Sequence, residues 1–411
     1  MAANPSDASQ VDLTSRQHPR STAATSAHTT HPETGNRRHS LRRRLLSDGS
    51  WAFGAKLVTT LATLVTNVLL ARLLTPAEFG TYILAISIVS FGAATGTLGL
   101  NQVVVRFVAE SLAKRDAPRA RRVIVISLRL GVLGTLGLSA AYLLLNPYLN
   151  QHLFSSPLLV SLAGLIAAWA ALTVLQRLIG ESFRGLHDIR YASIFRGWKE
   201  GMLSSVLTVA GLAVLWFYAG RTGLATVLWI TVAAGISSSL LGILLLNSKL
   251  RGLKATDTDE TPSGDLTSRD LLHVAWPLLI NNLTLFLLTQ SDIWILAALR
   301  PQEDIAVYGT AARLAGLVTI PLFVINAVVP PLIADLYIRR EQQKLQQILR
   351  TITTTAGLPA LVALVLLAFF GGPVLGLLFG DFFRQGPRSW PSSAWGSSPT
   401  STRAPAAWCS S

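Results

Sequence analysis

The chain is a succession of long apolar runs separated by short polar segments. About nine of these runs are long enough to cross a bilayer as an α-helix, which takes about 20 residues. The apolar residues form blocks instead of amphipathic stripes, and open strands cannot cross lipid because their edge backbone groups would be unsatisfied. The pattern therefore predicts an all-α polytopic membrane protein, with spans at residues 51–74, 82–107, 123–145, 158–179, 194–218, 224–246, 271–299, 305–336 and 352–379.

Two of the polar segments share one pattern. The first is LLARLLTPAEFGTY at residues 69–82, and the second is AALRPQEDIAVY at residues 297–308. Pro76 limits helix continuation to its N-terminal side and Gly80 permits a tight reversal, so each segment is expected to turn a helical hairpin. A hairpin repeated in each half indicates a transporter built from duplicated bundles. With one extra residue allowed, the matched positions are Leu74 with Leu299, Pro76 with Pro301, Glu78 with Glu303, and Tyr82 with Tyr308.

Composition and charge support this class. Charged residues make up 14% of the chain, against about 25% in soluble domains, and the mean hydropathy is +0.46. The basic residues gather before the first run and in every second loop after it, which places the N-terminus and these loops in the cytoplasm. The net charge of +14 therefore reflects topology and contact with anionic lipid headgroups, and no nucleic-acid partner is expected. The single cysteine, Cys409, excludes a disulfide framework within the chain.

The spacing of the runs predicts how the chain is organised. The second half holds fewer runs than the first, so its bundle looks truncated. A shift of reading frame near the C-terminus would explain this, because the Ser- and Trp-rich codons become apolar in another frame; the alternative is a natural soluble tail. The predicted parts are a disordered cytoplasmic tail (1–46), a six-helix bundle (47–250), a cytoplasmic linker (251–270), a partial bundle of three helices (271–381) and an irregular, frameshifted tail (382–411).

Several motifs carry a resemblance to a known family. The stretch from Gly49 to Glu110 contains a span that ends in ARLL, the hinge PAEFGTY, and the later LGL followed by Arg106. The second half contains SDIWILAAL, then VYGTAARLAGL and AVVPPLIADLY. Together these resemble the bacterial polysaccharide flippases of the Wzx type, within the multidrug/oligosaccharidyl-lipid/polysaccharide exporter superfamily. The resemblance covers roughly residues 49–381, and the hinge is its most specific part.

The resemblance implies an architecture and an activity. The fold would be two pseudo-repeated helical bundles around a central cavity. The activity would be alternating-access movement of a polyprenyl-diphosphate-linked oligosaccharide across the cytoplasmic membrane, for surface polysaccharide biosynthesis. Expected partners are this substrate, membrane lipids and other polysaccharide-assembly proteins. Other interpretations are a cation-coupled drug or small-molecule exporter of the same superfamily, and a non-functional truncated product or membrane scaffold.

Ionisable residues inside a span are functional candidates because an isolated charge there costs about 2.5–3.5 kcal/mol. Asp292 and Arg313 lie about equally far from the turn near Gln302, so they are expected at similar depth, where they would offset each other's burial. Arg313 would then bind a diphosphate or sugar hydroxyls. The alternative is a pair inside the bundle that only fixes packing.

For each of the remaining candidates, the evidence for a functional role is weaker when the residue is taken alone. Lys56 and Arg106 lie near the predicted cytoplasmic face, where they either meet the lipid diphosphate or snorkel to the headgroups. Neutral polar residues in the spans either bond sugar hydroxyls or hold helices together; those selected are Asn67, Asn281, Asn282 and Gln290. No Walker-type loop, catalytic grouping or metal-ligand set is evident, so neither enzyme chemistry nor a cofactor is expected.

Overall fold

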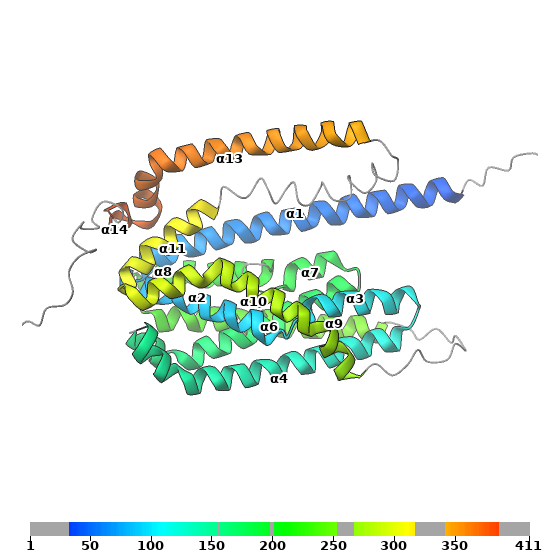
Figure 1. Cartoon of the computed structure of the whole chain (residues 1–411), viewed down its shortest axis with the longest axis horizontal. Helices are drawn as coiled ribbons and strands as arrows, with labels where there is room; N and C mark the ends of the chain where they lie inside the picture. The colour runs from blue at the N-terminus through cyan, green and yellow to red at the C-terminus, as the bar shows by residue number, and fades with distance from the viewer. Residues whose placement is uncertain (1–32, 155, 198–200, 253–266, 317–341, 386–411) are drawn as a thin grey trace, which may run out of the picture. The chain divides into compact units, whose positions relative to one another are not determined.

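The computed structural model describes residues 33–154, 156–197, 201–252, 267–316 and 342–385, and the described part is helical throughout with no strand (Figure 1). This confirms the predicted all-α class. By its internal contacts the chain divides into two units, residues 1–46 and 47–411. The helices considered below belong to the second unit, apart from the first residues of α1.

The first helix starts earlier than the apolar pattern indicates. α1 runs over Glu33–Leu73, so residues 33–46 are helical where we expected an irregular tail. No proline interrupts the segment after Pro32, and it is rich in Arg and Leu, which are good helix formers. The rest of the predicted tail lies outside the described residues.

The first hairpin turns at Leu74 and Thr75, and α2 (Pro76–Gly96) begins directly after them with Pro76 at its first position. Thr75 and Glu78 form a capping box: Thr75 N donates to Glu78 Oε2 at 3.0 Å, and Glu78 N donates to Thr75 Oγ1 at 3.3 Å. These bonds satisfy donors that the start of a helix leaves free. The expected role of Gly80 in the reversal is wrong, because Gly80 lies inside α2.

The second predicted span, 82–107, is two helices instead of one. α2 ends at Gly96, and α3 (Leu100–Ala113) follows a short turn. Leu98 and Gly99 have left-handed backbone conformations, with φ of 50° and 74°. A β-carbon on Gly99 would collide with the backbone of Ala275. Glycine at position 99 therefore lets α10 approach this turn more closely than any other residue type would allow.

The next helices complete the first half, and they follow the predicted third to sixth runs with additional breaks. α5 and α6 are separated at Leu162, and α7 and α8 are separated around Gly197, which has φ of 104°. The helices are α4 (Ala117–Leu149) with a π-helical extension η1 (Asn150–Phe154), α5 (Pro157–Ser161), α6 (Ala163–Gly185), α7 (Ile189–Phe195), α8 (Met202–Ala219) and α9 (Leu224–Gly252).

The second hairpin repeats the form of the first. α10 (Ser268–Leu299) ends at Leu299, and α1 ends one residue before the matched Leu74. Arg300 and Pro301 form the turn, and α11 (Gln302–Gly316) runs back from it. The C-terminal described helices are α13 (Gln342–Phe379) and α14 (Asp381–Gln385). Arg72 Nη2 donates to Leu377 O at 2.9 Å, which links α1 to α13.

Seven helices in the described part are long and apolar enough to span a membrane. α8 is apolar but shorter, and the eighth predicted run continues from α11 into residues outside the described part. These two cases account for the difference from the predicted number of spans. The tail after residue 385 also lies outside the described residues, so the frameshift hypothesis stays a prediction.

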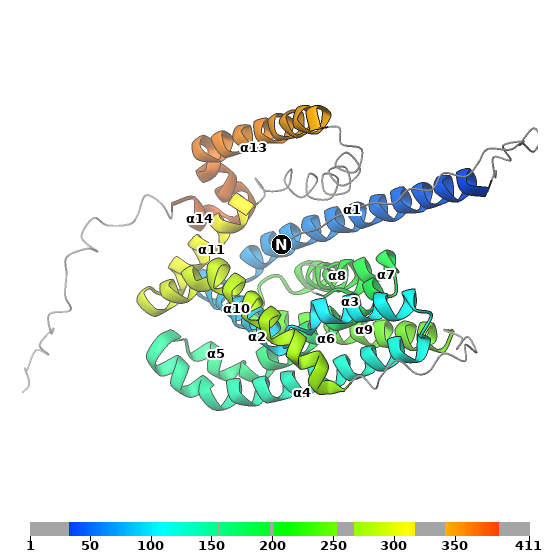
Figure 2. The ribbon, with the colours of Figure 1, turned by 45° about the vertical axis from the view of Figure 1, so that its right-hand side comes forward.

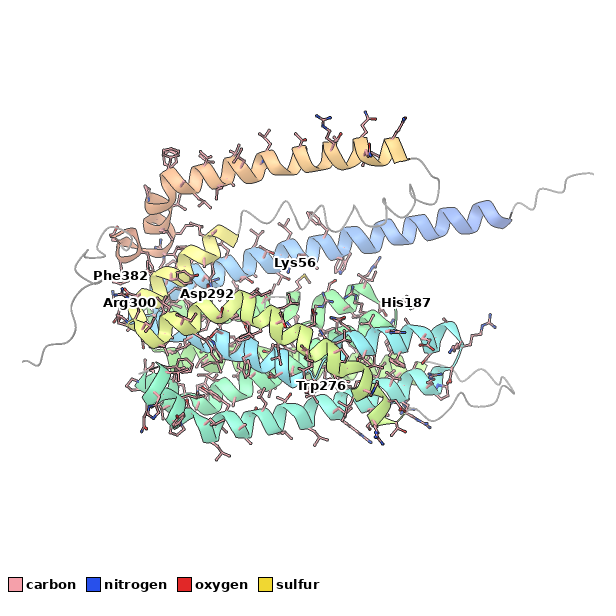
Figure 3. All side chains as sticks on the ribbon, in the orientation of Figure 1. Lys56, His187, Trp276, Asp292, Arg300 and Phe382 are labelled. Atoms are coloured by element: carbon pink, nitrogen blue, oxygen red, sulfur yellow. The ribbon has the colours of Figure 1, made fainter. Side chains whose placement is uncertain are left out.

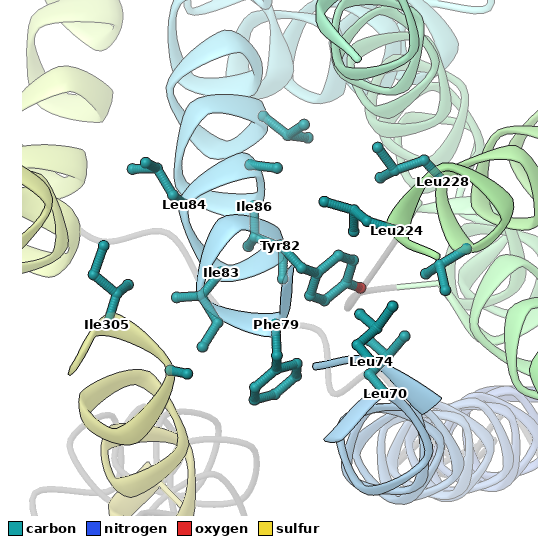
Figure 4. Close-up of a cluster of buried hydrophobic side chains, with 14 of the residues drawn as sticks. Leu70, Leu74, Phe79, Tyr82, Ile83, Leu84, Ile86, Leu224, Leu228 and Ile305 are labelled. Atoms are coloured by element: carbon teal, nitrogen blue, oxygen red, sulfur yellow. The ribbon is translucent and has the colours of Figure 1, made fainter. Parts of the chain in front are cut away.

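α2 is the most enclosed of these seven helices, because 83% of the residues in its apolar stretch are buried. Its side chains Phe79, Tyr82 and Ile83 are almost fully buried in a cluster that draws residues from α1, α9 and α11 (Figure 4). α10 also packs against α2, and both views draw the two helices side by side (Figures 1 and 2). Lipid is as apolar as these side chains, so close packing rather than a hydrophobic driving force holds the helices together.

Candidate functional site

The two hairpins meet along α2 and α11 through a pair of glycines. Gly80 of α2 faces the backbone carbonyl of Gln302, and Gly309 of α11 faces the side chain of Ile83. A β-carbon at either glycine would collide with these atoms. Small residues let helix backbones approach closely in membranes, so the two glycines set the spacing of this contact.

One polar contact crosses between the hairpins next to these glycines. Arg313 Nη1 of α11 donates to Asn67 Oδ1 of α1 at 2.5 Å. Asn67 is only 4% exposed, and its Nδ2 donates to Thr63 O at 2.7 Å, which orients its oxygen towards the guanidinium. Arg313 also lies 5.9 Å from the ring centroid of Phe79, within reach of a cation–π attraction. The cation is thus held by neutral groups.

Asp292 does not pair with Arg313, which corrects the expected pair. Its Oδ2 accepts a hydrogen bond from the Tyr308 hydroxyl, and its Oδ1 accepts one from Ile293 N. Tyr308 and Arg313 are five residues apart on α11, which is about 140° around the helix. Equal depth therefore does not bring Asp292 to Arg313, because the rotation of α11 presents Tyr308 to it instead.

The matched hairpins explain which residues meet. Asn67 and Asp292 are equivalent positions, since each lies seven residues before the matched leucine of its hairpin. Ser87 and Arg313 are equivalent in the returning helices, five residues after the matched tyrosine. Trp294 Nε1 of α10 donates to Ser87 Oγ of α2 at 2.7 Å. Each hairpin therefore bonds the returning helix of the other, through Asn67 with Arg313 and through Trp294 with Ser87.

The other predicted residues are dispersed. Lys56 on α1, Arg106 on α3 and Asn281 on α10 are exposed, and Figure 3 shows Lys56 and Asp292 on separate helices. Asn282 Nδ2 donates to Asn101 Oδ1 at 3.3 Å, which joins α10 to α3. Gln290 has a buried Oε1 that accepts no hydrogen bond within the described residues. The structure thus brings together Asn67 and Arg313, but not the remaining candidates.

Four residues that take part in these contacts were not predicted from the sequence. Tyr308 was considered only as part of the hinge, Phe79 was not selected, and the bond between Ser87 and Trp294 was not expected. A match of the two hairpins position by position would have pointed to Ser87, because it corresponds to Arg313. The contact of Arg313 with Phe79 had no comparable signal.

An apolar cavity of about 130 Å³ lies beside the first hairpin's returning helix. It is lined by side chains of α2, α4, α6 and α10, among them Phe91, Tyr142 and Trp294. None of the described residues that line it is charged, so it offers nothing to a phosphate. Within the described ranges no group of His, Cys, Asp or Glu has the arrangement of a metal site.

Comparisons with known proteins identify the family. The family described as "Polysaccharide biosynthesis protein" matches residues 45–337, most of the chain. The chain belongs to this family. A search of curated proteins gives no match. The similarity to the polysaccharide flippases that the hinge motifs indicated is thereby confirmed.

Solved structures with a similar fold are transporters. An inward-facing multidrug resistance MATE family transporter of the MOP superfamily is 18% identical with a TM-score of 0.59, covering 84% of this chain and 80% of that chain. A MOP superfamily transporter from Pyrococcus furiosus is 18% identical with a TM-score of 0.55, covering 83% and 75%. A mutant of the Vibrio cholerae MATE transporter VcmN is 16% identical with a TM-score of 0.54, covering 84% and 78%.

The family and the fold together establish a class. The chain has the fold of two pseudo-repeated helical bundles found in MATE-type transporters, and it is a polytopic helical member of the polysaccharide biosynthesis family. Its structural neighbours are transporters. The contact between the two hairpins therefore lies between the repeated halves of this fold.

Proposed function

We propose that the protein moves a lipid-linked oligosaccharide, a polyprenyl-diphosphate sugar, across the cytoplasmic membrane for surface polysaccharide biosynthesis. Membership of the polysaccharide biosynthesis family supports this substrate class, and the MOP superfamily fold supports a transport role. The movement proceeds by alternating access, in which the two halves open to one side of the membrane at a time.

Arg313 is the observation that carries the proposal. Its guanidinium lies within a spanning hairpin, and its hydrogen bond goes to the neutral oxygen of Asn67. Among the described residues no carboxylate pairs with it. A diphosphate offers pairs of charged oxygens, which the planar guanidinium can bind in a bidentate manner. The substrate would thus supply the counter-charge that the described part of the protein does not place beside Arg313.

The same contact can couple binding to opening. Asn67 and Arg313 belong to different hairpins, and the glycine contacts of Gly80 and Gly309 lie on the same pair of hairpins. A diphosphate that binds Arg313 competes with Asn67 for the guanidinium. Binding would therefore weaken one link between the halves at the moment when the substrate must pass.

The decisive experiment measures flux of a fluorescent lipid-linked sugar in proteoliposomes. We expect Arg313→Lys to lower the flux, because lysine keeps the charge but loses the bidentate geometry. Asp292→Asn tests whether the Tyr308-bound carboxylate also contributes. Normal flux together with reduced thermal stability in both variants would contradict the proposal and assign these residues to packing.

A second candidate function is cation-coupled export of a drug or another small molecule. The exposed carboxylate of Asp292, within a span and bonded to Tyr308, favours it, since such a group can carry a coupling proton or cation. This function requires a response to an ion gradient and no lipid carrier. Flux of a soluble amphiphile that follows an imposed gradient, with no lipid-linked sugar movement, would favour it over the flippase.

The location follows the same reasoning. We place the N-terminus and the basic loops in the cytoplasm and the two hairpin turns outside, according to the alternation of basic loops. The partners we propose are the lipid-linked substrate, membrane lipids and other polysaccharide-assembly proteins.

A further inference from the structure

A groove lined by arginines lies where the N-terminal part of α4 faces the end of α9. Its volume is about 480 Å³, and its lining combines cations with apolar side chains: Ala117, Pro118, Arg121, Arg122, Val125, Ile126, Arg129 and Leu250. Arg121 and Arg129 are exposed. None of the described residues that line the groove is acidic.

Two of the arginines, Arg122 and Arg129, follow one side of α4 in the direction of the helix axis, and Arg121 lies about 100° around the helix from Arg122. Arg122 and Arg129 are seven residues apart, which is about two turns and a rise of about 10 Å. Val125 lies between them on the same stripe, and Leu250 of α9 contributes from the facing helix. The groove thus extends from the end of the helix into the span, with positive charge along its length.

An exposed apolar surface continues from the groove along α4. Val132 and Leu133 lie within one turn after Arg129, and they are 43% and 64% exposed; Leu136, almost one turn further, is 60% exposed. A ligand that fits both parts needs an anionic head for the arginines and a hydrocarbon chain for the apolar stripe. A soluble anion would meet the first requirement and leave the second unused.

We propose that this groove binds an anionic phospholipid of the leaflet on the basic side of the membrane. The phosphate lies among Arg121, Arg122 and Arg129, and an acyl chain follows Val132, Leu133 and Leu136. Basic pockets between spanning helices are known to suit such headgroups. The site is separate from the Arg313 contact and does not depend on the identity of the transported substrate.

The test compares lipids on the full-length protein in detergent. Native mass spectrometry would measure retained phosphatidylglycerol and phosphatidylcholine, and thermal unfolding would measure the stabilisation that each lipid gives. We expect phosphatidylglycerol to be retained and to raise the Tm, while phosphatidylcholine does neither. In Arg121→Gln/Arg129→Gln, retention should fall about tenfold or more, because each basic residue near a lipid surface contributes a several-fold factor in affinity.

A matched control removes two charges elsewhere on the basic side. Arg115 and Arg269 are exposed and do not line the groove, so Arg115→Gln/Arg269→Gln should retain the lipid. Arg121→Lys/Arg129→Lys should also retain it, which separates lost charge from misfolding. An equal loss in both glutamine variants would overturn the proposal in favour of general surface charge. Displacement of the lipid by soluble glycerol phosphate would overturn it in favour of a free-anion site.

Discussion

Arg313 shows how a single side chain can join the two hairpins. It reaches from α11 to Asn67 on α1 and lies over the ring of Phe79. A hydrogen bond to a charged group contributes about 1.5–3 kcal/mol in soluble proteins, and hydrogen bonds between membrane helices average about 0.6 kcal/mol. The contact is therefore strong enough to bias a conformational equilibrium and weak enough for a substrate to replace.

The variant Asn67→Asp tests this contact by strengthening the attraction between residue 67 and Arg313. The new carboxylate would replace a neutral acceptor beside Arg313 and form an ion pair, which adds charge–charge attraction to the hydrogen bond. We expect a higher Tm in detergent and a lower flux, because the hairpins would separate less readily. Asn67→Leu is the control that removes the acceptor and should lower the Tm. A faster flux in Asn67→Asp would contradict the idea that the two hairpins must separate at this contact during transport.

Arg313→Gln tests the charge itself. Glutamine retains hydrogen bonding but cannot offer a cation to a diphosphate, so flux of the lipid-linked sugar should fall by about tenfold or more, in line with the loss of one charged hydrogen bond. Arg269→Gln, at an exposed position at the start of α10, should leave the flux unchanged. Equal flux in the two variants would show that Arg313 does not meet the substrate.

At the scale of elements, α2 is a helix that packs against helices of both halves of the chain. It packs against α4, α5, α6 and α9 of the first half and also against α10 and α11 of the second hairpin. Its own start is fixed by the Thr75–Glu78 capping box, and Glu78 Oε1 also accepts from Leu224 N of α9 at 3.4 Å. The hinge motif is therefore both a turn and an attachment point for α9.

Gly80→Ala should weaken the packing of α2 against α11. The added methyl group would collide with the carbonyl of Gln302, and overpacking of this kind costs about 1–3 kcal/mol. Thermal unfolding in detergent should show a lower Tm. Gly164→Ala is the matched control, since a β-carbon at Gly164 of α6 meets open space and alanine favours the helix by about 1 kcal/mol. A higher Tm for both variants would refute the close contact.

Thr75→Val should test the capping box without changing the shape of the side chain. Valine cannot accept from Glu78 N or donate to Glu78 Oε2, and loss of such a cap costs about 0.5–2 kcal/mol. The expected result is a reduced Tm. Thr60→Val removes a hydroxyl that donates to Lys56 O in its own helix, so its effect should be smaller. An equal effect would mean that the cap does not stabilise the turn.

At the scale of the whole molecule, the alternation of basic loops predicts which side each turn faces. The chain has one cysteine, so a Cys409→Ser background allows labelling of single introduced cysteines. A membrane-impermeant maleimide added to intact cells should label Arg221→Cys, between α8 and α9, and should not label Arg115→Cys, between α3 and α4. The reverse pattern would invert the topology and place the arginine groove in the outer leaflet.

The repeat of the hairpin was predictable because it depends on local chemistry. Pro76 and Pro301 cannot continue the helices that precede them, so each turn follows from the sequence. The break at Leu98–Gly99 was not predictable, because it lies inside an apolar run with no charged residue to mark it. Its cause is the approach of Ala275 from α10, which is remote in sequence.

The sequence by itself determined the all-α class and the two hairpin turns, and it singled out Arg313 and Asp292 as charges in apolar runs. Long apolar runs, prolines and alternating basic loops are local properties, and lipid imposes helices on them. Only the tertiary structure decided the partners. The rotation of each helix about its axis turns Arg313 to Asn67 and Asp292 to Tyr308. That rotation is set by packing between neighbours, such as Gly80 against Gln302, and a one-dimensional pattern does not contain it.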